Sequence, residues 1–552
     1  MARKTGRAIP LVVSALIGAI VVSGQVESQA RAIDYALDRA AAGLGATPKP
    51  VATEGVLAAA RRAAKSEDIG ERGAALLLLG LAQHVEDYAV LAEASVDPNP
   101  EIRHRATVAL GLLGTAPGYN ELARRLDASL RGTSDPSNSD AERAILAIAL
   151  GLSGDASDSS GVLKVHALEI LRRSRERHSE ELAACLIGIP VDEGRSVFEQ
   201  VLNLRTDCLP GVQGRVLNDT LVERIAVAAM SHRFVGQTEW MLVRNGLMRD
   251  DDDSMRRLVC LGLLEHSTEN LDEKLQDKIA RDLERRTGDR NPSVASLSLL
   301  ALAKYDERKA LSRARRIVDL DTRRPRSLDA AFLVIGMYGE KGDEARLRRW
   351  QARNRDAEAH AAWALATAEL ARRISPESFP PVPDETPRFP ILALRAGLTE
   401  SNTQNPLVRT AIVVALARLG DRESSGTIRS MFFTYAQTDY ARQLATAASH
   451  LDSAALEPVS GSELDAQVLL GQSFLGTPRL WKPLEEMLSL PGIDARQREA
   501  AFRIASIALA GRNGSFEARL RDRVGPVMLP PTLLRVAAWM DPRATLAMMP
   551  PR

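Results

Sequence analysis

The sequence predicts an all-α fold, an α-solenoid in which short helices are paired and stacked in series as a superhelical array. Three observations predict it. A short pattern with the same residues at its start, middle and end recurs along most of the chain. The composition is rich in aliphatic helix formers and poor in aromatic residues. The clearest copies of the pattern carry the residues that start and stop helices.

Composition supports helices over strands. Hydrophobic residues make up 45% of the 552-residue chain but aromatic residues only 4%, so a core must be built from Ala, Leu, Val and Ile. Ala and Leu lose little on entering a helix, whereas strands favour aromatic and β-branched residues. Lys and Arg total 72 against 71 Asp and Glu, so no overall charge directs the protein to nucleic acid or an anionic membrane.

The clearest copies of the pattern are residues 99–114, NPEIRHRATVALGLLG, and residues 405–420, NPLVRTAIVVALARLG. They match at Asn, Pro, Arg, Ala, Leu and Gly in one register. Further copies and weaker echoes lie at 141–154, 291–304, 71–82, 254–265 and 327–339. Self-similarity of this kind is typical of repeat proteins, in which each unit buries its apolar face against its neighbours.

Each copy reads as one helix with a defined start and stop. Asn99 can cap the helix by accepting a hydrogen bond from a free backbone N–H, and Pro100 fits the first helical position. Gly114 can take the left-handed conformation that ends a helix. Charged side chains, among them Arg105, are expected to turn away from the apolar face. That face is formed by Ala106, Ala109, Leu110 and Leu113.

A second helix is predicted after each stop, at 118–130 and at 423–436. Small Ala beside Leu on the first helices lets neighbouring helices approach closely. In such a stack we expect the exposed side chains of successive second helices to line the concave surface, and the whole to form one elongated core.

The run from Asp97 through Gly114, DPNPEIRHRATVALGLLG, resembles a HEAT repeat, particularly the short HEAT-like variety called phycobilisome-lyase-type. The copy at 405–421 is similar. The resemblance implies stacked antiparallel helix pairs, an armadillo-type superhelix and a concave face. The copies depart from the family pattern at Thr403, where Asp is usual, and at Ala295, where Arg is usual, which leaves the repeat count open. The motif is specific for a fold and says little about function.

Residues 1–30 read as a signal peptide. A basic start, with Arg3, Lys4 and Arg7, precedes an uncharged apolar run at 8–22. Ser28 and Ala30 suit the signal-peptidase positions before Arg31. The run is shorter than a spanning helix needs, although an uncleaved membrane anchor is the alternative. The sequence therefore predicts an exported protein, periplasmic or extracellular, alternatively anchored to the membrane by its N-terminal segment.

Residues 375–390, SPESFPPVPDETPRFP, hold six prolines and are predicted to be an extended linker. The linker divides the array into a first HEAT-like segment at 31–374 and a second at 391–552. Polar stretches at 132–140 and 153–161 read as loops inside the first segment, because repeat copies flank them closely.

We find no catalytic, cofactor-binding or metal-binding motif in the sequence. The His-Glu dipeptides with which HEAT-like hydroxylases hold a di-iron centre do not occur, nor does His-x-x-x-His. A Walker phosphate loop and a Gly-x-Ser-x-Gly nucleophile motif are also missing from the sequence. The widely spaced cysteines read as buried apolar side chains; they are Cys185, Cys208 and Cys260. We therefore expect no catalytic residue, no cofactor and no metal.

Two charged stretches have both a functional and a structural interpretation. Residues 250–253 are four consecutive carboxylates, which could bind a cation or favour the positive end of a helix beginning near Ser254. Basic residues outnumber acidic ones at 304–355, including RRPR at 323–326 and RLRRW at 346–350, which indicates an anion-binding strip or a solvated convex face. No aromatic interleaving accompanies them, so nucleic acid is not an expected partner.

Together these patterns predict an exported, non-enzymatic scaffold or adaptor that holds another protein in its concave surface. Membrane contact is expected only if residues 1–30 are not cleaved. Two alternatives remain open. One is an enzyme of the HEAT-like lyase or hydroxylase type with a site built across repeats, and the other is a membrane-anchored envelope-assembly factor.

Overall fold

The computed structural model is helical throughout the residues that it describes, with no strand among them. The described residues are 32–44, 51–130, 140–153, 159–173, 179–189, 191–203, 220–234, 236–249, 252–269, 271–320, 327–351, 356–380, 389–399, 405–436, 438, 440–452, 456, 466–475 and 477–514. Stacked, mutually packed helices over these ranges confirm the predicted all-α solenoid. The expected signal segment at 1–30 lies outside the described residues.

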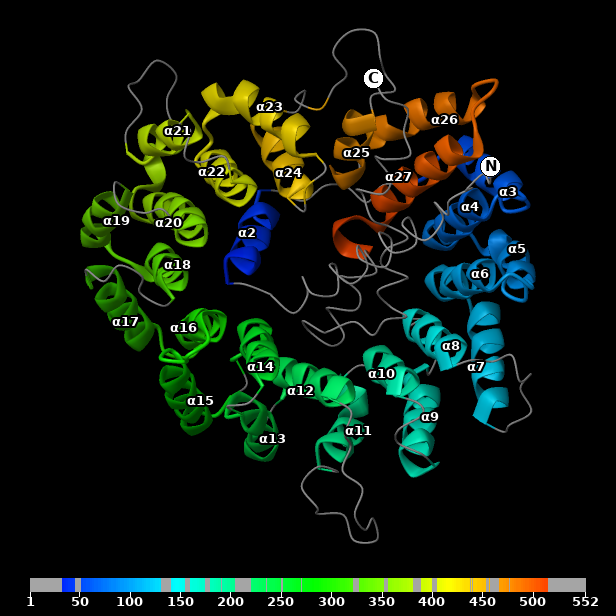
Figure 1. The fold of residues 1–552 in the computed structure, drawn as a ribbon, viewed down its shortest axis with the longest axis horizontal. Coiled ribbons are helices and arrows are strands. Elements are labelled where there is room, and N and C mark those ends of the chain that lie inside the picture. The colour runs from blue at the N-terminus through cyan, green and yellow to red at the C-terminus, as the bar shows by residue number, and fades with distance from the viewer. Residues whose placement is uncertain are drawn as a thin grey trace, which may run out of the picture.

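The helices form two concentric layers (Figure 1). The inner layer consists of α4 (Ile69–Ala82), α6 (Pro100–Leu113), α8 (Asp140–Leu152), α10 (Ser179–Gly188), α12 (Thr220–Arg233), α14 (Asp253–Glu265), α16 (Pro292–Tyr305), α18 (Leu328–Tyr338), α20 (Ala357–Ile374), α22 (Pro406–Arg418), α24 (Ala441–Leu451), α25 (Ala466–Leu475) and α27 (Ala495–Gly514). The outer layer consists of α3 (Glu54–Ala63), α5 (Tyr88–Ala94), α7 (Ala116–Leu130), α9 (Ser159–Arg173), α11 (Val191–Asn203), α13 (Gln237–Leu247), α15 (Glu273–Arg286), α17 (Glu307–Asp319), α19 (Glu344–Gln351), α21 (Ile391–Thr399), α23 (Ser425–Tyr435) and α26 (Trp481–Ser489). One helix, α2 (Ala32–Ala42), belongs to neither layer.

The array closes on itself as a ring. Each inner helix packs against the next from α4 to α27, and α27 in turn packs against α4 (Figure 1). In the outer layer α26 packs against α3 at the same junction. The expected elongated core is therefore wrong in its overall shape. A small rotation between successive helix pairs accumulates around the chain until the last pair meets the first.

The junction that closes the ring uses the same ion pair as junctions inside the chain. Arg103, the fourth residue of α6, donates from Nε to Oε1 of Glu142, the third residue of α8, at 2.6 Å. Arg143 on α8 donates to Glu181 on α10 at 2.9 Å. At the closing junction the Nη2 of Arg498 on α27 donates to Oε2 of Glu71 on α4 at 3.1 Å, again from a fourth residue to a third. Closure is thus one more regular step of the array.

The predicted start and stop signals are confirmed. The side chain of Asn99 accepts a hydrogen bond from the N–H of Glu101, and the proline that follows Asn99 is the first residue of α6. Asn291 and Asn405 cap α16 and α22 in the same way. Gly114, which follows α6, has φ of 66° in the left-handed region, where glycine is favoured because it lacks a Cβ.

The inner helices are buried on nearly every side, which goes beyond the single apolar face read from the sequence. In α16 every residue from 294 to 303 is buried, because the helix packs against both inner neighbours and the outer layer. Arg105, expected to turn away from the core, is only 4% exposed. Its guanidinium forms an ion pair with Glu101 at the junction of α4 and α6, and burial lowers its pKa despite that charge.

Glycine near the end of several inner helices lets the next helix approach closely. A Cβ added at Gly151 in α8 would lie 2.5 Å from the Cα of Gly188 in α10. A Cβ at Gly111 would overlap the main chain of Ala149, which cannot move aside as a flexible side chain could. The glycines therefore set the spacing between neighbouring inner helices.

Gly111→Ala is expected to destabilise the junction of α6 and α8 by about 1–3 kcal/mol, because overpacking forces the two backbones apart. Gly426 on α23 provides a matched control, since a Cβ there meets nothing within 4 Å. Gly426→Ala is expected to stabilise by up to about 1 kcal/mol. Denaturant unfolding with hydrogen exchange on the affected helices measures both, and changes of the same sign would contradict the close-packing argument.

The proline-rich residues 375–390 do not interrupt the inner layer, because α20 and α22 pack directly against each other across them. Residues 381–388 lie outside the described part of the chain. Whether 31–374 and 391–552 behave as separate segments stays a prediction. Among the described helices, none combines the length and the apolar character that crossing a bilayer requires.

Candidate functional site

The inside of the ring holds a helix of the chain itself. Helix α2 lies within the circle of inner helices and contacts five of them in succession, α16, α18, α20, α22 and α24 (Figure 1). We call the α2-facing side of these five helices the helix-binding surface. It is the only place in the described residues where a helix outside the two layers packs against the inner layer.

The sequence of α2 places its apolar residues on one side. Ile33, Leu37 and Ala41 are spaced four apart, so they form a stripe along the helix, and they are 0%, 1% and 6% exposed. Leu44, just beyond the helix, is also buried. Burial of an aliphatic side chain of this size contributes roughly 1.5–3 kcal/mol. An isolated helix of 11 residues is marginal in water, so α2 depends on this contact for its stability.

The C-terminal end of α2 is held by one arginine. Arg418, the last residue of α22, donates from Nη1 to the carbonyl oxygen of Ala40 at 3.1 Å. Its Nη2 forms an ion pair with Glu369 on α20. The last carbonyl groups of a helix have no partner within the helix and carry partial negative charge, so a guanidinium is a favourable cap. Gly43 leaves room for this group, since a Cβ there would lie 2.9 Å from Nη1 of Arg418.

The other side of α2 is polar and open. Arg39 is exposed, and its Nη1 donates to the hydroxyl of Tyr35 at 3.4 Å. Nearby, Lys304 at the end of α16 donates from Nζ to the carbonyl oxygen of Leu264 at 2.7 Å. Burial lowers the pKa of Lys304, and the positive charge of Arg39 lowers it further. Two basic side chains, Arg39 of α2 and Lys304 of α16, therefore lie near each other beside the apolar contact.

The first helix of each pair, and not the second, forms the inner surface. The predicted second helices at 118–130 and 423–436 correspond to α7 and α23, which lie in the outer layer (Figure 1). The expectation that second helices line the concave surface is therefore wrong. The first helices carry the apolar residues on more than one side, so they can pack on both inner neighbours and still present a face to α2.

Several basic side chains of the stretch 304–355 form ion pairs with carboxylates of the same stretch. Arg315 on α17 donates from Nη2 to Asp343 at 2.8 Å, and Arg346 donates from Nε to Asp319 at 3.1 Å. Burial would raise the pKa of Asp343, but hydrogen bonds from Arg315 and Arg346 outweigh it and hold the pKa below its usual value. Arg349 is close enough to Asp319 for a weak ion pair at 3.7 Å. These pairs favour the solvated-face interpretation; residues 323–326 lie outside the described part.

Of the acidic run at 250–253, the structure describes Asp252 and Asp253, which lie at the start of α14 as the structural interpretation expected; residues 250 and 251 lie outside the described part. The side chain of Asp252 accepts a hydrogen bond from the N–H of Met255 at 2.9 Å and caps α14. Arg224 contacts the same carboxylate at 3.1 Å. The side chain of Asp253 accepts from the side-chain amide of Asn291 at 2.8 Å. The carboxylates of Asp252 and Asp253 are therefore engaged by the protein.

Two of the three cysteines are buried free thiols, which confirms their predicted character. Burial raises the pKa of Cys260 to about 12, and that of Cys185 well above its usual value. Both are protonated near neutral pH, whereas a nucleophilic cysteine needs the thiolate. Cys208 lies outside the described residues.

The described histidines lie apart from one another, and two of them are buried. His166 lies 2.5 Å from a carboxylate oxygen of Glu181, which also binds Arg143. Burial opposes ionisation of Glu181, but His166 and Arg143 hold its pKa below the usual value. His266 stacks on the ring of Phe234 at 4.1 Å between centroids. Within the described ranges, no three His, Cys, Asp or Glu side chains gather as metal ligands would.

Comparison with known proteins identifies no family for this chain. No protein-family model matches the chain, and no curated protein matches it. Among solved structures, an engineered protein determined by the Northeast Structural Genomics Consortium aligns with 83% of this chain and 99% of its own length. The two are 14% identical with a TM-score of 0.23, which is too low to carry an argument.

Proposed function

We propose that this chain is an exported HEAT-repeat protein that holds a partner protein on the inner surface of its ring, as a scaffold or adaptor without catalytic activity. The observation that supports this most directly is α2 itself. A helix already lies on the inner surface, with an apolar stripe buried and a main-chain carbonyl hydrogen-bonded to Arg418. A surface that binds one helix in this way has the chemistry to bind another.

The chemistry of the described side chains favours binding over catalysis. The buried thiols of Cys185 and Cys260 are held protonated, so they are poor nucleophiles. Of the four carboxylates that could bind a cation, Asp252 caps a helix and pairs with arginine, and Asp253 accepts a hydrogen bond from asparagine. By contrast, the inner surface runs over many successive helices, the arrangement by which repeat proteins bind extended partners.

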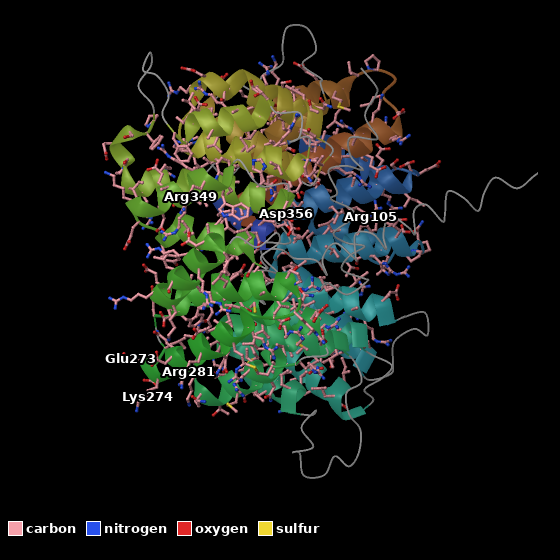
Figure 2. The ribbon with its side chains drawn as sticks, turned by 60° about the vertical axis from the view of Figure 1, so that its left-hand side comes forward. Arg105, Glu273, Lys274, Arg281, Arg349 and Asp356 are labelled. Atoms are coloured by element: carbon pink, nitrogen blue, oxygen red, sulfur yellow. The ribbon has the colours of Figure 1, made fainter. Side chains whose placement is uncertain are left out.

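Site-specific crosslinking in the native cell tests the proposal. A photoreactive benzoylphenylalanine in place of Lys304, near the end of α16 and beside Arg39 of α2, is expected to crosslink one partner protein. The same residue in place of Lys274 is the control. Lys274 is exposed on the outer helix α15, where Figure 2 shows it at the periphery of the molecule. Equal crosslinking at both positions, or none at position 304, would contradict inner-surface binding.

The same cells test export. Fractionation is expected to place the chain outside the cytoplasm, and N-terminal sequencing of the purified protein is expected to begin at Arg31. A chain that keeps residues 1–30 and sediments with membranes would replace the secreted form with the anchored one. A cytoplasmic chain would contradict export altogether.

A further inference from the structure

We propose that α2 is a displaceable ligand of the chain's own helix-binding surface, and that the partner inserts an amphipathic helix of its own in place of α2. This rests on the proposed function and adds to it the kind of segment that the partner presents. The partner helix carries an aliphatic and small stripe spaced four residues apart, and ends in a glycine beside Arg418.

The first step of the argument is that the helix-binding surface recognises few features of α2. Its apolar floor accepts Ile33, Leu37 and Ala41, which are aliphatic or small and pack without directional bonds. Its polar contact through Arg418 is made to a main-chain carbonyl, which every helix possesses. Recognition therefore depends on helical shape and on the stripe, and a foreign helix with both meets the same requirements.

The second step is that Arg418 is held in place independently of α2. Its ion pair with Glu369 joins α22 to α20, and neither residue belongs to α2. When α2 leaves, the guanidinium remains oriented toward the position of a helix C-terminus. The close approach of Gly43 adds a size limit, because a side chain there would collide with Nη1 of Arg418. A glycine just past the end of the incoming helix satisfies the limit and is also the common helix-stopping residue.

The third step is that α2 makes a small contact, which a longer helix can replace. It has 11 residues, and only Ile33 and Leu37 in its buried stripe are larger than alanine. Helices this short are marginal on their own. A longer partner helix can follow the inner layer beyond α24 or α16 and bury more apolar area. The advantage of α2 is that it belongs to the same chain as the surface, which supplies an effective concentration of about 1 mM.

The tether sets the size of the effect. If a free peptide with the sequence of α2 binds the empty surface with a Kd of about 10–100 μM, tethered α2 weakens its binding by about 10- to 100-fold. Removing α2 from the surface should strengthen peptide binding by the same factor. The prediction concerns the mature, full-length chain and needs no partner protein.

The experiment uses a fluorescent peptide of residues 31–44, RAIDYALDRAAAGL, and measures its binding by anisotropy. The wild-type chain is compared with Leu37→Asp, which puts a charge on the buried stripe and detaches α2. The variant is expected to bind the peptide about 10- to 100-fold more tightly than the wild-type chain. Arg39→Asp introduces the same residue on the exposed side of α2 and is expected to leave binding unchanged.

If Leu37→Asp fails to fold, hydrogen exchange on the wild-type chain tests the same proposal. The amides of α2 are expected to exchange at least 10-fold faster than those of α20 and α22, and faster still with excess peptide. If the amide hydrogens of α2 exchange only when those of its neighbours do, α2 is a permanent part of the core. That result would overturn the proposal. Equal peptide binding by wild type and a folded Leu37→Asp would do the same.

Failure of this inference can be told apart from failure of the proposed function. A crosslink from position 304 on α16 that Leu37→Asp does not strengthen would still show a partner inside the ring, but it would mean that the partner does not compete with α2. If the peptide displaces α2 but no crosslink forms in cells, the helix-binding surface would be supported and the proposed partner would not. A wild-type chain that dimerises by exchanging α2 would identify the occupant as a second copy and overturn the proposal.

Discussion

Arg498→Glu is expected to open the ring. The substitution removes the ion pair to Glu71 and places a carboxylate beside one whose side chain is 4% exposed. Leaving a buried charge without its partner costs about 3 kcal/mol or more. Glu71 keeps the hydrogen bond from Ser66, but the link to α27 is lost. Scattering should show a larger radius of gyration, and α3, α4, α26 and α27 should exchange amide hydrogens faster.

Arg103→Glu is the matched control, because Arg103 makes the same pair with Glu142 at an internal step of the ring. It should loosen α6 and α8 by a similar amount. The particle should not expand, since chain connectivity and closure on the other side hold those helices in place. Expansion by both variants would mean that the whole ring is loose, and expansion by neither would mean that closure does not depend on the pair.

Asp329→Asn is expected to stabilise the protein at pH 8 and to have little effect at pH 4. Asp329 lies on α18, where burial, together with the carboxylates of Glu358 and Asp356, raises its pKa to about 6. Its side chain accepts a hydrogen bond from Ser296 at 2.6 Å, which an Asn can keep. Because the pKa is raised in the folded state, the contribution of the Asp329 carboxyl to protein stability is fully present below about pH 4. This contribution is lost as the pH rises through 6. The total loss is roughly 3 kcal/mol, at about 1.4 kcal/mol per pKa unit.

Asp343→Asn is the control with the opposite sign. Asp343 is fully buried, and Arg315 and Arg346 hold its pKa below the usual value. It therefore stabilises the protein above about pH 4, and this contribution falls as the carboxylate is protonated. Relative to the wild-type chain, the denaturant midpoints of the two variants should change in opposite directions between pH 4 and pH 8. Hydrogen exchange should follow the same change locally, because repeat arrays can unfold in parts. Parallel pH profiles would contradict the assigned environments.

The local features of each helix could be predicted from the sequence, whereas the closure of the ring, which depends on all the repeats together, could not. Asn99, Pro100 and Gly114 act on a few neighbouring backbone groups, so their roles could be read directly. Closure through Arg498 and Glu71 depends on the summed rotation of every intervening step, which no single copy reveals. Arg105 was expected on the wrong side because the helices around it are not visible in its own repeat: α4 packs against its side chain, and closure brings the charges of Glu499 and Arg503 on α27 near it.

The site was missed for a different reason. The spacing of Ile33, Leu37 and Ala41 is visible in the sequence, and it predicts an amphipathic helix directly after residues 1–30. The helix lacks the Asn-Pro start of the repeats, so it does not match the repeat pattern. Where such a helix docks is decided by surfaces contributed from far along the chain, such as Arg418 and Glu369.

A closed inner layer removes the termini at which stacked repeats ordinarily come apart. An open array must protect its first and last units with polar faces, and it frays from those units inward. Here α4 and α27 cover each other, so each has an inner neighbour on both sides. Detaching any unit then requires breaking two interfaces at once, and the circle should melt as a more cooperative body than a linear stack of the same helices.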